Sequence, residues 1–450
     1  MSYKRFWDEE RETMPSAQRN KIILERLQFQ LDYAYNRLPF YREHYDSKGF
    51  HPSSVKSLED FSTKVPIITK QMLVEEQTAY PPFGRYLGVE ASELIRIHGS
   101  SGTTGKPTMY GVSAKDWIRG GEVSVMGLWC VGVRPHHRVQ ITYPFSLFFG
   151  GWGVLDATER IGATAFPTGS VVPTDRQIEL LKALSCDVLC GTPSYLSHLA
   201  GRAGELGFDR DGFKVELTFM GGEPGGSIAS VRKLLSEAWN GAAVVDVSAG
   251  STSEMYPFLT NVGCFENQGG GVHLFQDENY TEIVSADDAN VPLEPGQQGV
   301  TVGTHLWRES QPMIRFWMGD ESVMEDSTCT CGRTYPRLPF GVYGRRDDML
   351  LVRGANIYPS AIEAVVRDTP RVGSEFRVIV DRYGYLDELS VEAEAAPHLD
   401  ADSYGDLERE LASKLSLAVN VRVEVKVVPP DTLELQTFKA RRVVDRRPRL

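Results

Sequence analysis

The 450-residue sequence is short of three features that define common classes of protein. Its six cysteines are too few for a disulfide scaffold of this length, so we expect a reduced, cytoplasmic protein. No apolar run reaches the roughly 20 residues that cross a bilayer, and the charged segment 1–10 lacks the apolar stretch of a secretory signal. Lysine and arginine number 48 against 60 acidic residues, a net charge of −12 that argues against general nucleic-acid binding. We therefore expect neither a membrane nor a nucleic acid as a partner.

The composition, 41% hydrophobic and 24% charged, is ordinary for a globular protein, and the length allows two or more domains. Apolar residues at helical spacing predict helix over about 15–50, and strands alternating with helices over 94–260 predict layered α/β units around a parallel sheet. Residues 270–320 are more β-rich. After residue 344 the pattern restarts, with a helix from about 360, strands near 377–381 and 388–393, a helix near 403–418 and a strand near 420–428. We predict a large α/β unit over 1–344 and a compact α+β unit over 345–450.

The most informative stretch is a glycine- and hydroxyl-rich loop that follows an apolar-alternating segment at 94–97. Glycines let backbone N–H groups approach an anion, hydroxyls add donors and Lys106 adds charge, which suits a polyphosphate. It is not a Walker A loop, because Ser100 stands at the position of that motif's first glycine and Pro107 follows the lysine. The alternative is a plain surface loop. The expected phosphate-binding residues are Ser100, Ser101, Gly102, Thr103, Thr104, Gly105 and Lys106.

The run Ser-Ser-Gly-Thr-Thr-Gly-Lys-Pro-Thr over 100–108 resembles the phosphate-binding signature of adenylate-forming enzymes, the acyl-CoA synthetase superfamily. Its form looks most like the phenylacetate-CoA ligase branch, and the Pro-Phe-Tyr segment at 35–42 resembles the same branch. The resemblance covers nearly the whole chain. It implies a large adenylation domain, a small mobile C-terminal domain, and the use of ATP, Mg²⁺ and CoA.

Three further motifs of the family have counterparts around the expected nucleotide site. At 244–254 a strand runs into a polar turn, and the resemblance implies that Glu254 is the magnesium-linked glutamate, since carboxylates suit Mg²⁺. Gly250 stands where the family carries the aromatic residue that stacks on adenine. The sequence therefore leaves open which residue of this chain stacks on the base. The resemblance also implies that Asp320, in the run Arg-Phe-Trp-Met-Gly-Asp, accepts hydrogen bonds from the ribose. The other residues implied at the nucleotide are Gly222, Glu223, Pro224, Ser251, Thr252, Ser253 and Arg345.

The resemblance also covers the linker into the C-terminal unit. The run Gly-Arg-Arg-Asp-Asp-Met at 344–349 matches the family's interdomain linker. This implies that Asp347 is the hinge about which the small domain rotates between two half-reactions. The residues implied to line the tunnel for the pantetheine thiol are Arg353, Gly354, Ala355 and Asn356.

The last motif lies near the C-terminus. The resemblance implies that Lys439 bridges the substrate carboxylate and the α-phosphate and stabilises the charge that develops there. Phe438 replaces the glycine that the family commonly has before this lysine, and Arg441 and Arg442 are the alternative cations. The expected catalytic residues are Lys439, Glu254 and Lys106.

Three cysteines and a histidine form a candidate metal site. Cys329 and Cys331 make a short Cys-x-Cys knuckle, and Cys264 is followed nine residues later by His273. Three thiolates and one imidazole suit structural Zn²⁺. Buried free cysteines or a redox pair are the alternatives. The remaining cysteines, Cys130, Cys186 and Cys190, lie in apolar stretches and are expected in the core.

A run of aromatics and glycines over 143–153 is the candidate acid pocket. In the family that the sequence resembles, this region lines the pocket for the carboxylic acid substrate. Flat aromatic walls suit an aryl or arylacetic acid. Core packing is the alternative. The residues assigned to the pocket are Tyr143, Phe145, Phe148, Gly150 and Gly151.

The reaction implied by the resemblance has two steps. A carboxylate attacks the α-phosphate of ATP and releases pyrophosphate, and the CoA thiol then attacks the acyl-adenylate to give an aryl-CoA thioester. Two alternatives stay open: an acyl-AMP ligase that loads the phosphopantetheine of a carrier protein, and a non-catalytic ligand-binding relative. A homodimer is one assembly that the sequence allows.

Overall fold

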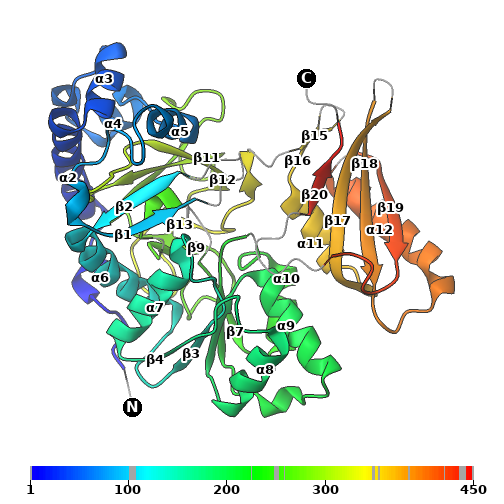
Figure 1. Cartoon of the computed structure of the whole chain (residues 1–450). Coiled ribbons are helices and arrows are strands. Elements are labelled where there is room, and N and C mark those ends of the chain that lie inside the picture. The colour runs from blue at the N-terminus through cyan, green and yellow to red at the C-terminus, as the bar shows by residue number, and fades with distance from the viewer. Residues whose placement is uncertain are drawn as a thin grey trace.

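The computed structural model describes residues 3–100, 108–223, 225–247, 253–257, 259–346, 350–352, 355–383, 386–419, 421–434 and 442–447. Figure 1 shows a large N-terminal part, built from layers of helices and sheets, and a separate C-terminal part of strands and two helices. The predicted class, a layered α/β unit followed by a small α+β unit, is confirmed. No helix in the described ranges combines the length and the apolarity that a membrane crossing needs.

A set of helices covers one side of the N-terminal part. Its long helix α2 buries Ile23, Leu27, Leu31 and Ala34 on one face, the spacing that predicted helix over 15–50. Pro39 ends α2 and begins α3, because proline disfavours a helical residue before it and fits the first helical position. The helices are α1 (Glu9–Glu12), α2 (Ser16–Arg37), α3 (Pro39–Ser47), α4 (Leu58–Lys64) and α5 (Lys70–Ala79).

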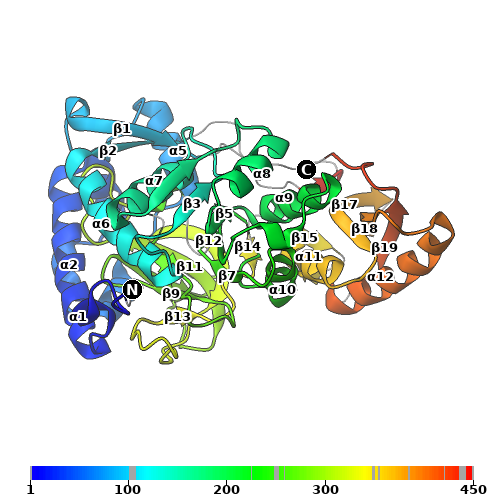
Figure 2. The same ribbon diagram turned by 90° about the horizontal axis from the view of Figure 1, so that it is seen from below.

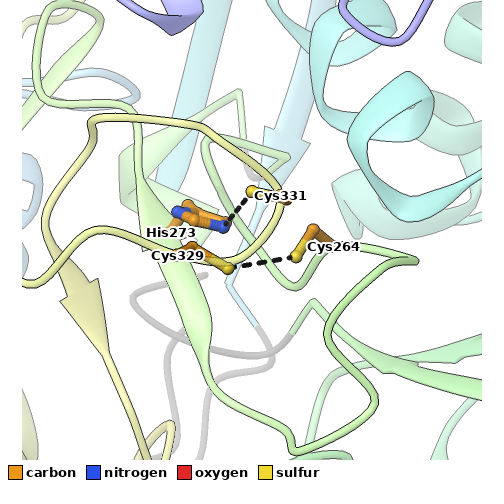
Figure 3. Close-up of side chains that lie close together, drawn as sticks. All are labelled: Cys264, His273, Cys329 and Cys331. Atoms are coloured by element: carbon orange, nitrogen blue, oxygen red, sulfur yellow. Dashed lines mark hydrogen bonds between the residues drawn. The ribbon is translucent and has the colours of Figure 1, made fainter.

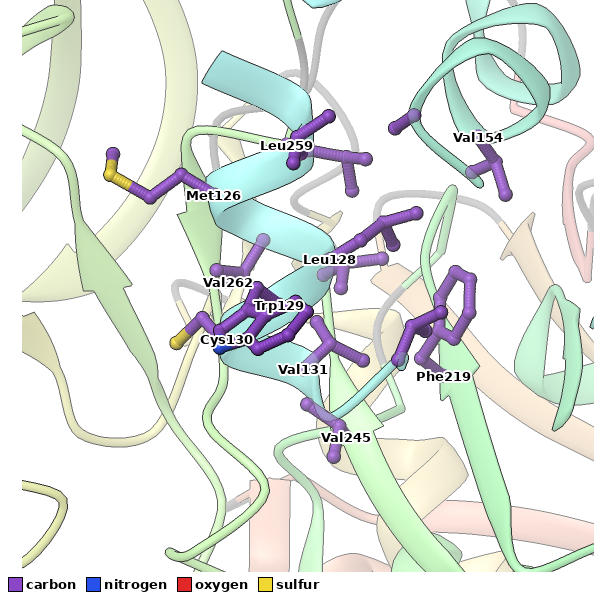
Figure 4. Packing of buried hydrophobic residues seen from close by; sticks show 14 of the residues in the cluster. Met126, Leu128, Trp129, Cys130, Val131, Val154, Phe219, Val245, Leu259 and Val262 are labelled. Carbon is purple, nitrogen blue, oxygen red and sulfur yellow. The ribbon is translucent and has the colours of Figure 1, made fainter. Parts of the chain in front are cut away.

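The centre of the large part is a parallel sheet with strand order β4-β3-β5-β6-β7. Its strands are β3 (Arg138–Ile141), β4 (Thr164–Pro167), β5 (Val188–Gly191), β6 (Leu217–Met220) and β7 (Ala243–Asp246). The helices around it are α6 (Ala114–Val131), α7 (Phe149–Ile161), α8 (Thr174–Ala183), α9 (Pro193–Glu205) and α10 (Ala229–Ala238). Figure 4 shows Leu128 and Val131 of α6 facing Phe219 and Val245 of the sheet. This apolar contact fixes the sheet against α6. Cys130, Cys186 and Cys190 are buried, as expected.

Antiparallel strands make up the rest of the large part, in agreement with the β-rich prediction for 270–320. One sheet contains β10 (Asn279–Val284), β11 (Gln298–His305), β12 (Phe316–Val323) and β14 (Gly344–Arg345), in that order. A smaller one contains β13 (Arg337–Leu338), β9 (Val272–Leu274) and β8 (Asn261–Val262). The hairpin β1 (Leu94–Gly99) and β2 (Met109–Ser113) stands alone. Short 3₁₀ helices lie at Pro52–Ser54, Ala91–Glu93, Arg210–Gly212, Ser253–Met255 and Ala401–Ser403.

The C-terminal part has its own sheet and its own core. Its sheet order is β19-β18-β17-β20, and a hairpin precedes it. Val378, Val391, Leu411 and Leu415 are among the residues of its core. The elements are β15 (Leu350–Val352), β16 (Ala355–Ile357), α11 (Pro359–Arg367), β17 (Val372–Tyr383), β18 (Leu386–Ala395), α12 (Tyr404–Val419), β19 (Val423–Val428) and β20 (Val443–Asp445). Elements α11, β17, β18, α12 and β19 match the helices and strands predicted after residue 344, whereas β15, β16 and β20 were not predicted.

Candidate active site

Polar turns follow the carboxyl ends of the central parallel strands. Thr142 follows β3, Thr192 follows β5, and Gly221–Gly222 follow β6. Gly222 has φ of +91°, a conformation that favours glycine. In open α/β sheets, ligands bind beyond these strand ends. The turn at Gly222, which the sequence assigned to the nucleotide, therefore lies at the edge of the sheet where a ligand would bind.

Glu254 is the centre of a buried polar network. Its Oε1 accepts a hydrogen bond from the hydroxyl of Tyr110 at 2.9 Å and pairs with Nζ of Lys70 at 3.0 Å. Burial opposes the charged form, but Lys70 and Tyr110 outweigh it, so the pKa of Glu254 lies below its usual value. The carboxylate is therefore ionised at neutral pH and offers the hard oxygen ligands that Mg²⁺ prefers.

The same network reaches both ends of the predicted phosphate loop. Ser100 and Thr108 flank it and close on each other: the Ser100 N–H donates to the Thr108 carbonyl at 3.0 Å, and the Thr108 N–H donates to the Ser100 hydroxyl at 3.1 Å. The hydroxyl of Thr108 is hydrogen-bonded to that of Tyr110. Tyr110 thus connects the base of the loop to Glu254, which lies 144 residues after Tyr110 in the sequence.

Lys70, Tyr110 and Arg308 are absent from the residues that sequence reasoning selected. Arg308 is fully buried and donates to the backbone carbonyl of Glu254 at 3.2 Å and to that of Gly111 at 3.2 Å. It therefore holds the turn of Glu254 against strand β2. Nothing local in the sequence marks these three residues, because each acts through partners far along the chain.

Asp320 lies on β12, opposite Arg345 of β14, so the implied ribose carboxylate and the start of the linker are adjacent. Asp320 is buried and its carbonyl accepts a hydrogen bond from the Thr301 hydroxyl at 3.1 Å.

The next residue, Glu321, pairs with Arg346 at 3.4 Å. Burial and then Glu321 raise the pKa of Tyr358, which immediately precedes α11. Glu321 thus ties the large part to the start of the C-terminal part.

The aromatic run at 143–151 contains both buried and half-buried rings. Tyr143 is buried in the main core, as the core-packing alternative expected. Phe145 is half-buried, with its ring edge-to-face against Trp152 at 5.2 Å. Gly150 lies under the half-buried Phe148, because a Cβ there would come within 2.6 Å of that ring. Gly151 faces backbone carbonyls, and a Cβ there would lie 3.0 Å from that of Pro144. Both glycines therefore allow close approach that a larger residue would prevent.

The four predicted metal ligands come together (Figure 3). Cys264, His273, Cys329 and Cys331 are all buried, and their ligand atoms lie within 4.8 Å of one another. The sulfurs of Cys264 and Cys329 are 3.7 Å apart, and Sγ of Cys331 is 3.4 Å from Nε2 of His273. A tetrahedral ion with Zn–S bonds of about 2.3 Å separates two sulfurs by about 3.8 Å, so this set fits Zn²⁺. The backbone N–H of Arg333 points to Sγ of Cys331 at 3.5 Å, a contact that favours the thiolate.

Some of the predicted site residues lie outside the described residues, and for others only the backbone is described. Ser253 begins a 3₁₀ helix, and Ala355 and Asn356 belong to β16. The sequence predictions that lie outside the described residues are Ser101, Gly102, Thr103, Thr104, Gly105, Lys106, Pro224, Ser251, Thr252, Asp347, Arg353, Gly354 and Lys439.

Comparison with known proteins identifies the family. Residues 354–447 match the model of the AMP-binding enzyme C-terminal domain. The phenylacetate-coenzyme A ligase of Thermus thermophilus is 33% identical and covers 97% of this chain and 99% of its own length. The chain belongs to the phenylacetate-CoA ligase family.

Solved structures extend the similarity to the arrangement of the two parts. A 2-hydroxyisobutyryl-CoA ligase bound to 2-HIB-AMP in the postadenylation state is 39% identical and superposes with a TM-score of 0.94, covering 99% of this chain and 93% of that one. The same ligase with 2-HIB-AMP and CoA in the thioesterification state superposes with a TM-score of only 0.75, at 40% identity and again covering 99% of this chain and 93% of that one. Because sequence and coverage hardly differ between the two comparisons, the lower score reflects a different arrangement of the chain.

Proposed function

We propose that this chain is an AMP-forming acid–CoA ligase. Its central feature is the ionised, buried Glu254 joined through Tyr110 to the base of the phosphate loop. A fixed anion beside a polyphosphate loop suits binding of Mg²⁺ with ATP. Membership of the phenylacetate-CoA ligase family supports the same reaction.

The proposed reaction has two balanced steps. A carboxylate oxygen of the acid attacks the α-phosphorus of ATP, and the bond to pyrophosphate breaks. The CoA sulfur then attacks the acyl carbonyl, its proton is lost, and the bond between the acyl carbon and the AMP oxygen breaks. Splitting the condensation into two displacements lowers each barrier. When bound, Mg²⁺ neutralises phosphate charge during the first step.

The proposed roles of this chain's residues follow the order of the reaction. Glu254 would hold Mg²⁺, which would bind the phosphates, Lys106 contacts the phosphates from the loop, and Asp320 accepts hydrogen bonds from the ribose. Lys439 neutralises the attacking carboxylate. We place the domain division at 344/345 and the hinge at Asp347. The TM-score of 0.94 with the 2-hydroxyisobutyryl-CoA ligase in the postadenylation state supports the view that the small domain of this chain stands as it does in that state, before it rotates for thioester formation.

An aryl or arylacetic acid is the proposed substrate. The half-buried rings of Phe145 and Phe148, and the phenylacetate-CoA ligase of Thermus thermophilus, favour this class. A small 2-hydroxy acid is the second candidate, because the 2-hydroxyisobutyryl-CoA ligase is the more similar of the two, at 39% identity. Free CoA is the proposed acceptor, and a carrier protein is its alternative.

Exchange of labelled pyrophosphate into ATP tests the function. Phenylacetate, benzoate, 2-hydroxyisobutyrate and acetate are each supplied with ATP and Mg²⁺, and Lys439→Ala is compared with the wild type. We expect exchange that depends on the acid and falls by at least 10²-fold in the variant, as for loss of a charge-stabilising group. ATP binding without exchange for any acid would favour the ligand-binding relative.

We also propose that Cys264, His273, Cys329 and Cys331 hold a structural Zn²⁺. Their burial and spacing support a closed four-ligand site rather than an open catalytic one. Metal analysis of the purified chain should give one zinc per chain. Cys331→Ser should lose it and melt at lower temperature, whereas Cys190→Ser, also a buried cysteine, should keep it. Full zinc content in Cys331→Ser would contradict this assignment.

A further inference from the structure

The hairpin at the base of the phosphate loop is held from outside by side chains. Strands β1 and β2 form a sheet of two strands, so one edge of β2 pairs with β1 and the other edge faces different elements. Backbone N–H and C=O groups on that second edge need partners, because leaving them unpaired in the interior costs free energy. Figure 1 and Figure 2 both place helix α5 beside this hairpin.

Gln77 of α5 takes the place of a neighbouring strand at Met109. Its Oε1 accepts the N–H of Met109 at 2.8 Å, and its Nε2 donates to the Met109 carbonyl at 2.7 Å. A residue of an antiparallel strand would make the same two hydrogen bonds. Nε2 also donates to the hydroxyl of Tyr86 at 2.6 Å, and Gln77 and Tyr86 are both buried. The amide of Gln77 is therefore fixed in one orientation.

The next backbone position on this edge, Gly111, is held by a different element. Its N–H donates to Oε1 of Gln311 at 2.6 Å. Its carbonyl accepts hydrogen bonds from the hydroxyl of Ser310 at 2.9 Å and from Arg308 at 3.2 Å. These three partners lie in one segment between β11 and β12. Of the contacts on this edge, the one made by Gln77 is nearer to the phosphate loop.

The position of Met109 determines the position of the residues on either side of it. Thr108, the preceding residue, closes the base of the loop against Ser100 through two hydrogen bonds. Tyr110, the following residue, donates its hydroxyl to Oε1 of Glu254 at 2.9 Å. A shift of Met109 would therefore move the base of the loop and the partner of Glu254 together.

Helix α5 also contacts Glu254 directly. Lys70 lies seven residues before Gln77, which is two helical turns and hence the same face of α5. Its Nζ pairs with Oε1 of Glu254 at 3.0 Å. One helix thus holds Glu254 through Lys70 and the hairpin through Gln77, and it fixes the separation between the two.

We propose that Gln77 is a positioning residue for the nucleotide: by holding both backbone groups of Met109, it keeps Tyr110 against Glu254 and sets the geometry that receives Mg²⁺ with ATP. This inference rests on the proposed function. Gln77 acts through the backbone of Met109, and small displacements of a binding group are costly even when that group is intact. The affinity for Mg²⁺ with ATP should therefore depend on Gln77, whereas KM for the acid should not.

Gln77→Met removes the amide and keeps the length of the side chain. Gln276→Met is the matched control, because the buried Gln276 makes the same pair of hydrogen bonds with the backbone of Thr281, at 2.7 and 2.9 Å, in strand β10. Gln77→Asn is a milder second variant that keeps an amide with a shorter reach. Tyr110→Phe, alone and combined with Gln77→Met, tests whether Gln77 acts through Tyr110.

Three measurements are made on each variant of the full chain. Calorimetric titration with ATP and Mg²⁺, without acid, gives the affinity in the absence of turnover. Pyrophosphate exchange gives separate KM values for ATP with Mg²⁺ and for the acid. Urea denaturation gives the midpoint of unfolding.

We expect Gln77→Met to weaken the binding of ATP with Mg²⁺ by roughly 10-fold, the size of two lost hydrogen bonds, and Gln77→Asn to weaken it less. KM for ATP with Mg²⁺ should rise by the same factor, and KM for the acid should stay unchanged. Gln276→Met should lower the urea midpoint about as much as Gln77→Met and leave the affinity at the wild-type value. The variant that combines Gln77→Met with Tyr110→Phe should lose less affinity than the product of the two single losses.

Wild-type affinity in both Gln77 variants, or equal weakening in Gln276→Met, would overturn the proposal, the second because it would indicate general loss of structure. A loss in the combined variant equal to the full product would also overturn it, since Gln77 would then not act through Tyr110. Binding of ATP with Mg²⁺ by the wild type without exchange for any acid would contradict the proposed ligase function alone. The calorimetric comparison would still decide the role of Gln77.

Discussion

Replacing Lys70 with methionine should destabilise the protein, because the buried carboxylate of Glu254 loses its cationic partner. Lys70 pairs with Oε1 of Glu254 at 3.0 Å, and Glu254 is buried. Methionine keeps the length of the side chain and removes the charge. Glu254 then loses a cation that keeps it ionised, while the hydrogen bond from Tyr110 to this oxygen remains.

The size of the effect follows from the exposure of the two partners. Breaking a fully buried pair costs about 3–5 kcal/mol, and breaking an exposed pair costs about 0–1 kcal/mol. Lys70 is 32% exposed and Glu254 2%, and Tyr110 still compensates part of the charge. We therefore expect the free energy of unfolding to fall by about 2 kcal/mol at pH 7.5.

The pH dependence has a definite sign. The pKa of Glu254 in the folded protein lies below its ordinary value of 4.5. Its stabilising contribution is therefore present above pH 4.5 and is lost as the pH falls through the folded pKa. The difference in free energy of unfolding between Lys70→Met and the wild type should therefore have its full size at pH 7.5 and should shrink below pH 4.5.

Urea denaturation followed by tryptophan fluorescence at pH 7.5, 5.5 and 4.0 measures this difference. Lys115→Met is the matched control, because Lys115 also pairs with a glutamate, at 2.7 Å, but is 75% exposed. The control should change the free energy of unfolding by less than about 1 kcal/mol. Equal effects of the two substitutions, or a Lys70→Met effect that is independent of pH, would refute the reasoning.

Three other substitutions test the packing of the large part by the same measurement. Glu12→Gln should cost about 3 kcal/mol, because the fully buried Arg333 loses its partner at 2.6 Å and keeps only the more distant Glu266, at 3.9 Å; a loss below about 1 kcal/mol would contradict this. Gly201→Ala, in helix α9 with nothing within 4 Å of the added Cβ, should stabilise by about 0.5–1 kcal/mol. Gly226→Ala should destabilise, because its Cβ would lie 2.7 Å from Cα of Asp246; a neutral result would show that this turn can shift.

The elements were predictable where local pattern decides structure. The apolar stripe of Ile23, Leu27 and Leu31 predicted α2, and the restart after residue 344 predicted the strands and helices of the C-terminal part, because periodicity reports which face is buried. The chemistry of three thiols and one imidazole also predicted correctly that Cys264, His273, Cys329 and Cys331 would come together. For the helices and strands, residue type and spacing were sufficient; for the four metal-ligand candidates, the residue types carried the prediction, because their spacing is not that of a standard zinc finger.

The site network could not be predicted, because it depends on distant pairing. Lys70 is an unremarkable lysine at the start of a helix until the fold places it beside Glu254, 184 residues later in the chain. Tyr110 belongs to a strand whose alternation indicates burial and nothing about its hydroxyl partner. Arg442 was a candidate catalytic cation in the sequence, and only the tertiary structure shows that its charge is used inside the small domain.

The fate of the substrate's carboxylate oxygen tests the central claim most directly. The acid that gives the strongest pyrophosphate exchange is labelled with ¹⁸O in its carboxylate and converted with ATP, Mg²⁺ and CoA, and the products are analysed by mass spectrometry. If the carboxylate attacks the α-phosphorus and the thiol then displaces AMP, one ¹⁸O must appear in AMP and none in pyrophosphate. Formation of ADP with ¹⁸O in inorganic phosphate, or unlabelled AMP beside the thioester, would contradict the adenylate route.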